Sequence, residues 1–242
     1  MKINRIYQPG TYQPGDTVDL SPSAGQHVSV VLRMKPGEHL TLFRGNNYEY
    51  HAVIVSAQKR QVTVQIQSHQ KMDRESFRMI HLAQSISKGE RMEWVIQKAV
   101  ELGVSTITPL ISERTVVRVD ENRLSKKLAQ WQAIAIAACE QCGRNSLPTL
   151  HPITVFQDYI QQTEAELKLL LDPESEKTWR DFDFEVKDIT LLIGPEGGFS
   201  QNEIDLARAH QFQGLKLGPR ILRTETAAIS ALSMLQAVSG DL

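Results

Sequence analysis

A chain of 242 residues can form one large or two small domains, and 41% hydrophobic with 23% charged residues is typical of a soluble globular protein. No apolar run is long enough to span a bilayer, the first residues contain no apolar segment of a secretory signal, and two cysteines are too few for a disulfide scaffold. The net charge of −1 does not by itself indicate nucleic-acid binding, and we expect a cytoplasmic protein.

The first seventy residues have the pattern of a small β domain. Strands are expected at Leu40–Phe43 and Tyr48–Val55, on either side of a turn at Arg44–Asn47, and at Val62–Gln67, where apolar and polar residues alternate. A short helix or turn is expected at Gln26–Arg33. Few helices and several short strands predict a small barrel. This section has seven Lys or Arg against four acidic residues, a mildly basic balance that is compatible with phosphate contact.

After the polar stretch Lys71–Glu75, the pattern changes to strands that alternate with helices. The expected strands are Met79–Gln84, Val104–Ile111 and Leu167–Leu171, and the expected helices are Glu90–Leu102, ended by Gly103, and Asn122–Cys142. Such alternation predicts a parallel sheet whose faces are covered by helices. The polar stretch is therefore the expected boundary between two domains.

The strongest functional signal lies between residues 189 and 228. An apolar strand at Ile189–Ile193 leads into the loop Gly194–Gly198, and a short strand at Leu215–Leu217 leads into a second loop at Gly218–Arg220. In open α/β sheets, ligands bind beyond the carboxyl ends of the strands. Glycine-rich loops let a flat ligand approach the backbone closely. The two loops therefore predict a ligand site, and the alternative is a purely structural turn.

The loops do not match the common phosphate-binding motifs. Neither G-x-G-x-x-G nor Gly-Lys-Ser/Thr is present. The helix after the first loop opens with a capping box at Ser200–Glu203, which occupies the first N–H groups of that helix and argues against a phosphate there. The last helix, Thr226–Val238, is apolar nearly all round and must be buried on more than one side. A second copy of the chain would provide such burial, so we expect a homodimer.

Several segments resemble one known family. GPEGGFS and LGPRILRTETA in the last fifty residues, QKAVELGVSTITPLISERTVV at 97–117, EQCGR at 140–144 and HVSVVLRMKPGE at 27–38 are similar to the 16S ribosomal RNA uridine-N3 methyltransferases of the RsmE type, in the SPOUT superfamily. The resemblance covers nearly the whole chain. It implies a PUA-like RNA-binding β-barrel at residues 1–71, followed by a SPOUT methyltransferase domain at 72–242. That domain would be a parallel α/β sheet with a C-terminal trefoil knot.

The same resemblance implies an activity and a cofactor. S-Adenosylmethionine would donate a methyl group to N3 of a specific uridine in the 16S RNA of the small ribosomal subunit, without a metal ion. Apolar side chains and backbone at three strand ends would hold the cofactor. The residues expected to bind it are Leu170, Leu171, Gly194, Pro195, Glu196, Gly197, Gly198, Leu217, Gly218, Ile221, Leu222 and Thr224. For Leu171 and Leu222, an ordinary core position remains the alternative.

Methylation of uracil at N3 requires loss of the N3 proton, so the enzyme must supply a base or stabilise the uracil anion. Glu225 and Glu196 are the candidate bases. Arg223 and Arg114 are the candidates for stabilising negative charge on O2 or O4. An Arg next to a Glu is most often an ion pair without chemistry, and Glu225 as a simple helix anchor stays an alternative.

The family pattern also implies RNA contacts, some in the N-terminal domain and some beside the expected pocket. The residues are Arg5, His27, Arg33, Lys35, Lys88, Arg114, Gln141 and Arg144. A solvated surface charge is the alternative for each arginine and lysine, and a packing role is the alternative for His27. Cys139 and Cys142 end a helix and lack a second Cys or His pair at zinc spacing, so we interpret them as buried thiols and expect no metal.

Two other functions remain open. A different SPOUT methyltransferase would use the same cofactor on transfer RNA or on a ribose 2′-hydroxyl. A non-catalytic RNA-binding factor in ribosome assembly would bind RNA without the cofactor, and the intact glycine loops count against it. A generic nucleotide-binding protein is disfavoured because phosphate loops are missing from the sequence.

Overall fold

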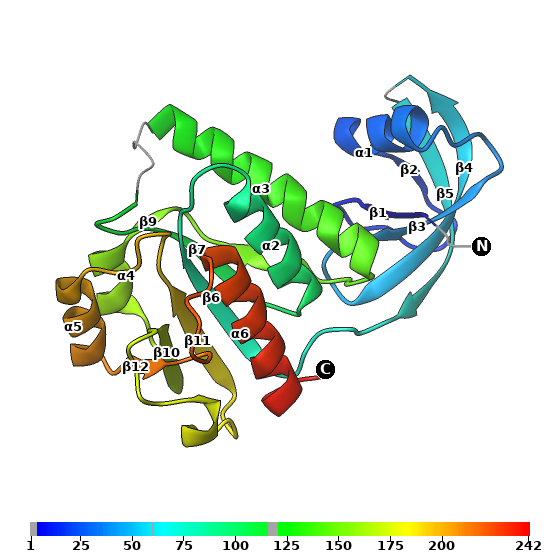
Figure 1. The fold of residues 1–242 in the computed structure, drawn as a ribbon. Coiled ribbons are helices and arrows are strands. Elements are labelled where there is room, and N and C mark those ends of the chain that lie inside the picture. Colours follow the sequence, from blue (N-terminus) through cyan, green and yellow to red (C-terminus); the bar gives the residue numbers. More distant parts are fainter. Residues whose placement is uncertain (1–3, 60, 116–120) are drawn as a thin grey trace. The chain divides into compact units, whose positions relative to one another are not determined.

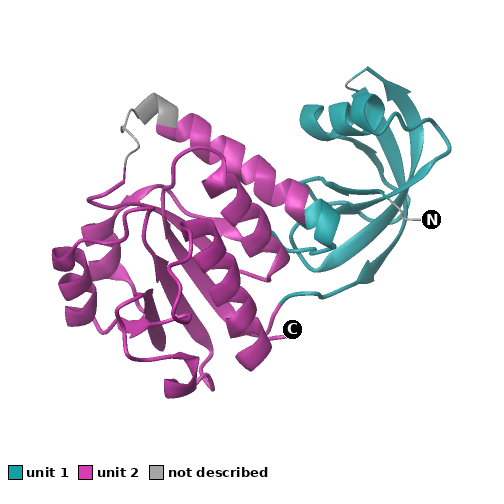
Figure 2. Ribbon diagram, viewed as in Figure 1, with its two compact units in different colours: residues 1–75, 139–147 teal, residues 76–138, 148–242 magenta. Residues whose placement is uncertain are grey.

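The computed structural model describes residues 4–59, 61–115 and 121–242. It divides into two compact units, shown in different colours in Figure 2. Unit 1 comprises residues 1–75 and 139–147, and unit 2 comprises residues 76–138 and 148–242. The predicted boundary at 71/72 lies close to the first of these divisions. Residues 139–147 also belong to unit 1, whereas the sequence predicted them in the second domain.

Unit 1 contains, within its described residues, a five-stranded sheet of order β1-β3-β4-β5-β2. The strands are β1 (Asn4–Tyr7), β2 (Thr17–Asp19), β3 (His39–Phe43), β4 (Tyr48–Gln58) and β5 (Gln61–Lys71). β1 runs parallel to β3, and the other neighbours are antiparallel. The predicted hairpin is confirmed: Gly45 and Asn47 both adopt positive φ in the turn between β3 and β4. The alternating apolar residues of β5 face the core of this unit.

The segment expected as a short helix or turn at Gln26–Arg33 begins earlier than predicted. Ser21 caps helix α1 (Pro22–Gln26) by accepting a 3.4 Å hydrogen bond from the Ala24 N–H. A π-helical turn η1 (His27–Val31) continues it. Arg33 then adopts φ 54°, a left-handed conformation that is uncommon for a residue other than glycine.

An ion-pair network lies inside unit 1. The Glu49 carboxylate, 8% exposed, pairs with Arg5 at 2.5 Å and with Arg74 at 2.7 Å. Burial alone would raise the pKa of Glu49, but hydrogen bonds and charges from the two guanidinium groups outweigh burial and lower it from 4.5 to about 2. Arg5 also donates a hydrogen bond of 2.6 Å to the side-chain oxygen of Asn145.

Residues 139–147 are bound to the N-terminal strands by further hydrogen bonds. The Tyr7 N–H donates a hydrogen bond of 2.9 Å to the Glu140 side chain, and Arg144 forms an ion pair with Glu75 at 2.5 Å. Arg74 donates 2.9 Å to the Gly143 carbonyl. The C-terminal end of helix α3 (Glu121–Cys142) therefore completes unit 1, whereas the part of this helix up to Ala138 belongs to unit 2.

Unit 2 is built on a parallel sheet of order β12-β10-β11-β6-β7-β8, with β9 also paired to β7, as far as the structure describes the chain. Its strands are β6 (Met79–Ser85), β7 (Thr106–Ile111), β8 (Thr149–Leu150), β9 (Thr154–Val155), β10 (Leu167–Leu171), β11 (Asp188–Ile193) and β12 (Gln213–Leu215). Its helices besides α3 are α2 (Arg91–Glu101), α4 (Phe156–Gln162), α5 (Gln201–Ala209) and α6 (Thr224–Ser239), with a 3-10 turn η2 (Trp179–Asp181).

Helices cover the sheet of unit 2 as predicted. α2 packs against α6, and α4 packs against α5 (Figure 1). β6 lies between β7 and β11, so the chain extends the sheet first on one side of β6 and later on the other. Ligand sites form where strand order reverses in this way, at the carboxyl ends of the strands. The predicted strand at 215–217 is shifted: β12 ends at Leu215.

The last helix is less buried within one chain than its composition predicts. α6 buries Ala228, Ala231, Leu232 and Leu235, whereas Val238 is 37% exposed. Among the described residues, no helix combines the length and apolar character needed to cross a membrane.

A histidine cluster lies under α4. His81 on β6 hydrogen-bonds Thr108 at 2.8 Å and contacts the Tyr159 hydroxyl at 3.4 Å. Burial, aided by the neighbouring ring of His151, lowers the pKa of His81 from 6.5 to about 4. The folded chain therefore holds His81 neutral under conditions in which the unfolded chain protonates it.

We expect the free energy of unfolding to fall as pH is lowered from 6.5 to about 4. In this window the unfolded state binds more protons, and one such histidine contributes at most about 1.4 kcal/mol per pH unit. Urea unfolding at several pH values measures the slope, and His81→Asn should reduce it. The matched variant His39→Asn, at an exposed position, should leave the slope unchanged. Equal slopes for wild type and His81→Asn would contradict this account.

Candidate active site

A pocket lies at the carboxyl ends of β10, β11 and β12, inside unit 2. Its lining includes most of the residues predicted to bind a cofactor: Leu171, Gly194, Pro195, Glu196, Gly198, Leu217, Gly218, Ile221, Leu222 and Thr224. Asp172, Pro173, Ile193, Leu215, Arg220 and Ala227 also line it. The structure thus brings the three predicted strand ends and both loops together around one cavity.

Two predicted cofactor residues lie outside this lining. Leu170 is fully buried in the hydrophobic cluster under α4 and α5. Side chains alternate along a strand, so Leu170 and Leu171 point to opposite faces, and only Leu171 faces the pocket. Gly197 instead directs its carbonyl to Arg114, which donates a 2.8 Å hydrogen bond to it.

The first loop needs glycine at its start. A Cβ on Gly194 would lie 3.2 Å from the backbone of Gly198 and Phe199. The Gly198 N–H closes the turn on the Pro195 carbonyl at 2.9 Å, with Gly198 at φ 67°. The predicted capping box is confirmed, because the Ser200 and Glu203 side chains each accept the other's backbone N–H.

Thr224, the first residue of α6, connects this loop to the central strand. Its hydroxyl donates a hydrogen bond of 2.7 Å to the Gly194 carbonyl and accepts one of 3.0 Å from the Gln84 amide. Gln84 is completely buried at the end of β6. Gln84 is not among the residues predicted for the site, although a glutamine at the end of an apolar strand is the kind of buried polar residue that signals a site.

Asp172 places a buried carboxylate in the pocket lining. One oxygen accepts a hydrogen bond of 3.1 Å from Arg208, and the other accepts one of 3.0 Å from the Glu174 N–H. From the sequence, Asp172 is predicted only as part of a strand-end loop. A carboxylate at this position favours a ligand that carries positive charge.

Both candidate bases meet at Arg91, which sequence analysis did not identify. Arg91 forms an ion pair with Glu196, and its Nε lies 3.9 Å from Glu225 Oε1. The Lys88 N–H also donates 3.0 Å to Glu196. Burial acts to raise the pKa of Glu196, but hydrogen bonds from its own backbone N–H, from the Lys88 N–H and from Arg91, together with the charge of Arg91, outweigh burial and lower it.

The predicted arginines of the reaction lie beside this cluster. Arg114 is exposed and holds the Gly197 carbonyl. Arg223 is the exposed N-cap residue of α6, directly before Thr224 and Glu225. Neither arginine is shown in contact with a substrate, so their roles remain predictions.

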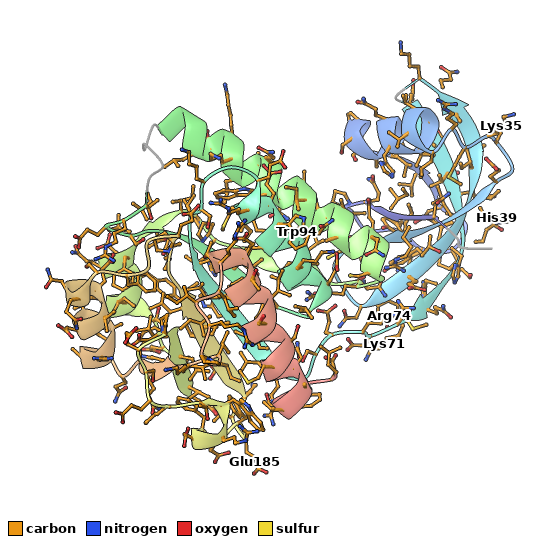
Figure 3. The ribbon with its side chains drawn as sticks, in the orientation of Figure 1. Lys35, His39, Lys71, Arg74, Trp94 and Glu185 are labelled. Atoms are coloured by element: carbon orange, nitrogen blue, oxygen red, sulfur yellow. The ribbon has the colours of Figure 1, made fainter. Side chains whose placement is uncertain are left out.

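The residues predicted to contact RNA differ in accessibility. In unit 1, Arg33, Lys35 and Gln141 are exposed and His27 is half-buried, and Figure 3 shows Lys35 pointing away from the sheet. Arg5 and Arg144 are instead largely enclosed in ion pairs. In unit 2, Lys88 and Arg114 are exposed. RNA contact stays a prediction for all eight, and it fits the exposed side chains better.

Both cysteines lie on α3 as free thiols. Cys139 is buried, and burial raises the pKa of its thiol to about 12. Cys142 is half-buried on the same helix. Within the described ranges, no three His, Cys, Asp or Glu side chains are grouped so that they could hold a metal ion.

The chain is similar to known proteins in sequence and in structure. A family model described as an RNA methyltransferase domain matches residues 74–236, and one described as an RNA methyltransferase PUA domain matches residues 26–67. The chain is 39% identical to the ribosomal RNA small subunit methyltransferase E of Buchnera aphidicola from Schizaphis graminum, over all of this chain and 98% of that protein. It is 31% identical to the Bacillus subtilis protein of the same name, covering 90% and 88% of the two chains.

Two similar solved structures contain S-adenosylmethionine. A putative methyltransferase from Legionella pneumophila, in complex with this cofactor, is 56% identical with a TM-score of 0.99 over the full length of both chains. The ribosomal RNA small subunit methyltransferase E of Neisseria gonorrhoeae, bound to S-adenosylmethionine, is 38% identical with a TM-score of 0.93 over both full chains. These matches confirm the predicted fold class, a SPOUT-type parallel sheet with an N-terminal PUA-like domain, whereas the trefoil knot stays a prediction.

Proposed function

The chain belongs to the ribosomal RNA small subunit methyltransferase E family, and from this premise we propose that it methylates N3 of a uridine in 16S ribosomal RNA. S-Adenosylmethionine would be the methyl donor, and the reaction would take place in the cytoplasm during ribosome assembly. The observation that carries the proposal is the pocket at three strand ends, lined by the candidate base Glu196, with the second candidate, Glu225, near the same arginine, Arg91.

The residues of the pocket fit S-adenosylmethionine. Leu171 and Leu222 offer apolar surface for an adenine, and the loops at Gly194 and Gly218 offer backbone groups at close approach. The buried carboxylate of Asp172 suits the positive charge of the cofactor. When bound, the cofactor supplies a methyl group on a positively charged sulfur, which is reactive without a metal ion.

The remaining roles follow from the chemistry of uracil. Glu225 or Glu196 would accept the N3 proton, and Arg223 or Arg114 would stabilise negative charge on the uracil oxygens. Exposed Arg33, Lys35 and Lys88 would contact phosphates. Because RNA enzymes act on splayed bases, the uridine would be turned out of its stack.

We also propose that the chain acts as a homodimer. α2 and α6 pack against each other, and each leaves a large apolar side chain accessible, with Trp94 55% and Val238 37% exposed. A two-fold pairing through these helices would cover both side chains. Sedimentation equilibrium of the full chain distinguishes the dimer from a monomer.

The test of the reaction uses purified full-length protein, radiolabelled S-adenosylmethionine and small ribosomal subunits from cells that lack this modification. Mass spectrometry of the nucleosides should find 3-methyluridine in 16S RNA. Label in transfer RNA or on ribose oxygens would instead favour another SPOUT methyltransferase. RNA binding without cofactor binding would favour the non-catalytic assembly factor.

A further inference from the structure

Arg91, the first residue of α2, connects the two carboxylates that the sequence leaves as alternative bases. Its guanidinium forms an ion pair with Glu196 of the first loop and lies 3.9 Å from Glu225 of α6. One cation thus faces two carboxylates, so the cluster has one negative charge in excess. Such a cluster becomes electrically neutral when it takes up one proton.

The two carboxylates differ in how their oxygens are used. Oε1 of Glu196 already accepts hydrogen bonds from Arg91 and from the Lys88 N–H at 3.0 Å. Its side chain is 32% exposed, and its pKa is lowered although burial acts in the opposite direction. Glu196 is therefore a weak proton acceptor and serves to keep Arg91 in place.

Glu225 keeps one oxygen unused. Its side chain is 16% exposed, and Oε2 is shielded from solvent without a hydrogen-bond partner among the described residues. A buried polar atom without a partner is uncommon in folded proteins and calls for an explanation, such as a group that arrives with a ligand. Thr224, the residue before Glu225, lines the pocket proposed for the cofactor. A group that bonds to Glu225 Oε2 would therefore belong to the other reactant, the uracil of the RNA.

Further buried polar atoms without partners cluster nearby. Gln84 Oε1, Ser85 Oγ and Ser87 Oγ have none within the described chain, and Gln84 is hydrogen-bonded to Thr224 at 3.0 Å. The end of β6 and the start of α6 therefore share an incompletely bonded polar region, which the hydrogen bond between Gln84 and Thr224 links to the pocket lining. This clustering favours a reactant site over an isolated packing defect.

We propose that Glu225 is the catalytic base that accepts the uracil N3 proton on Oε2, and that Arg91 is the positioning residue that holds the Glu225 side chain in place through Oε1. The inference rests on the proposed function. The N3–H bond breaks, its electron pair stays on N3, and the proton bonds to Oε2. Arg91 and Glu196 then remain as a neutral pair, and Glu225 releases the proton to water after the product leaves.

Glu225→Gln tests the base, because the amide has the same shape but cannot take the proton. Single-turnover methyl transfer with saturating subunits and cofactor should slow about 10²- to 10⁴-fold, while the Kd for S-adenosylmethionine changes less than about threefold. Glu196→Gln should slow the reaction less than about tenfold. Glu101→Gln, at a carboxylate paired with Lys98 on α2, should behave as wild type.

A substrate with a more acidic N3 proton separates a chemical role from a structural one. With 5-fluorouridine in place of uridine in the RNA, the deficit of Glu225→Gln should shrink, because less help is needed to remove the proton. A structural defect would give the same deficit with both substrates. An unchanged deficit would therefore overturn the assignment of Glu225 even if the variant is inactive.

Arg91 is tested through a split between rate and binding. Arg91→Gln removes the cation between Glu196 and Glu225, so single-turnover methyl transfer should slow while the Kd for S-adenosylmethionine stays near the wild-type value, and Arg91→Lys should restore part of the rate. Equal rates for Arg91→Gln and wild type, or no rescue by Arg91→Lys, would overturn the positioning role. Absence of 3-methyluridine with the wild-type protein would overturn the proposed function and this inference together. Full activity of Glu225→Gln beside an active wild type would overturn this inference alone.

Discussion

Replacing Gly194 by alanine is expected to weaken binding of S-adenosylmethionine roughly 10- to 100-fold, the equivalent of about 1–3 kcal/mol of overpacking. The added methyl group would lie 3.2 Å from the backbone of Gly198 and Phe199, which cannot move aside as a flexible side chain can. The loop must open to accept it, and the Thr224 hydrogen bond to the Gly194 carbonyl would be disturbed. The pocket would thereby lose its shape on the side where the cofactor is proposed to lie.

Isothermal titration of the folded variant with S-adenosylmethionine measures this effect. Gly45→Ala is the matched control, because Gly45 has φ 89° with open space around it and lies in the hairpin of unit 1. It should cost about 1 kcal/mol of stability through backbone strain and leave the Kd unchanged. Binding by Gly194→Ala that equals wild type would show that the loop does not contact the cofactor.

Glu49→Gln is expected to destabilise unit 1 by about 3–5 kcal/mol. The substitution leaves Arg5, with a side chain only 12% exposed, as a buried cation without its carboxylate, and it removes the partner of Arg74. The stabilising effect of Glu49 is present above pH 4.5 and is lost as pH falls toward 2, because its pKa in the folded chain is about 2. Acid should therefore reproduce part of the effect of the substitution.

Hydrogen exchange of peptides from β1 and β3, followed by mass spectrometry, reports the stability of unit 1 separately. Glu101→Gln, which breaks the more exposed pair with Lys98, should cost less than about 1 kcal/mol. The double variant Arg5→Met with Glu49→Leu should recover much of the loss, because a buried pair can be replaced by apolar side chains. Faster exchange confined to unit 2 after Glu49→Gln would contradict this role.

Periodicity and turn residues predicted most of unit 2. The strand at Leu167–Leu171 and the capping box at Ser200 were predicted at the residues where the structure has them, and the helix at 90–102 differs by one residue at each end. These features depend on local physics, namely apolar runs, helical faces and backbone capping. The two loops of the pocket were predicted for the same reason, because glycine and proline mark them in the chain.

Features that depend on distant residues were not predictable from the same signals. Strand β1 has only four residues and joins its sheet by pairing with β3, and β8 and β9 have two residues each. No local sequence signal distinguishes Arg91 from an ordinary surface arginine at a helix start. Its proposed role depends on Glu196 and Glu225, which are more than a hundred residues away in the sequence. Arg144 carried a family-based expectation of RNA contact, yet its side chain is buried against Glu75.

The division of unit 1 between residues 1–75 and 139–147 affects how the protein is made. The ribosome delivers the N-terminal strands first, but the partners that Tyr7 and Arg5 find in Glu140 and Asn145 are translated later. At about 5–20 residues per second, the 133 and 140 residues that separate these partners take roughly 7 to 28 s to translate. During this delay, the strands of unit 1 lack their hydrogen bonds to residues 139–147. We therefore expect chaperone binding to the nascent chain to be highest in this interval. The first part of the chain to be synthesised is thus completed only when much of unit 2 has also emerged.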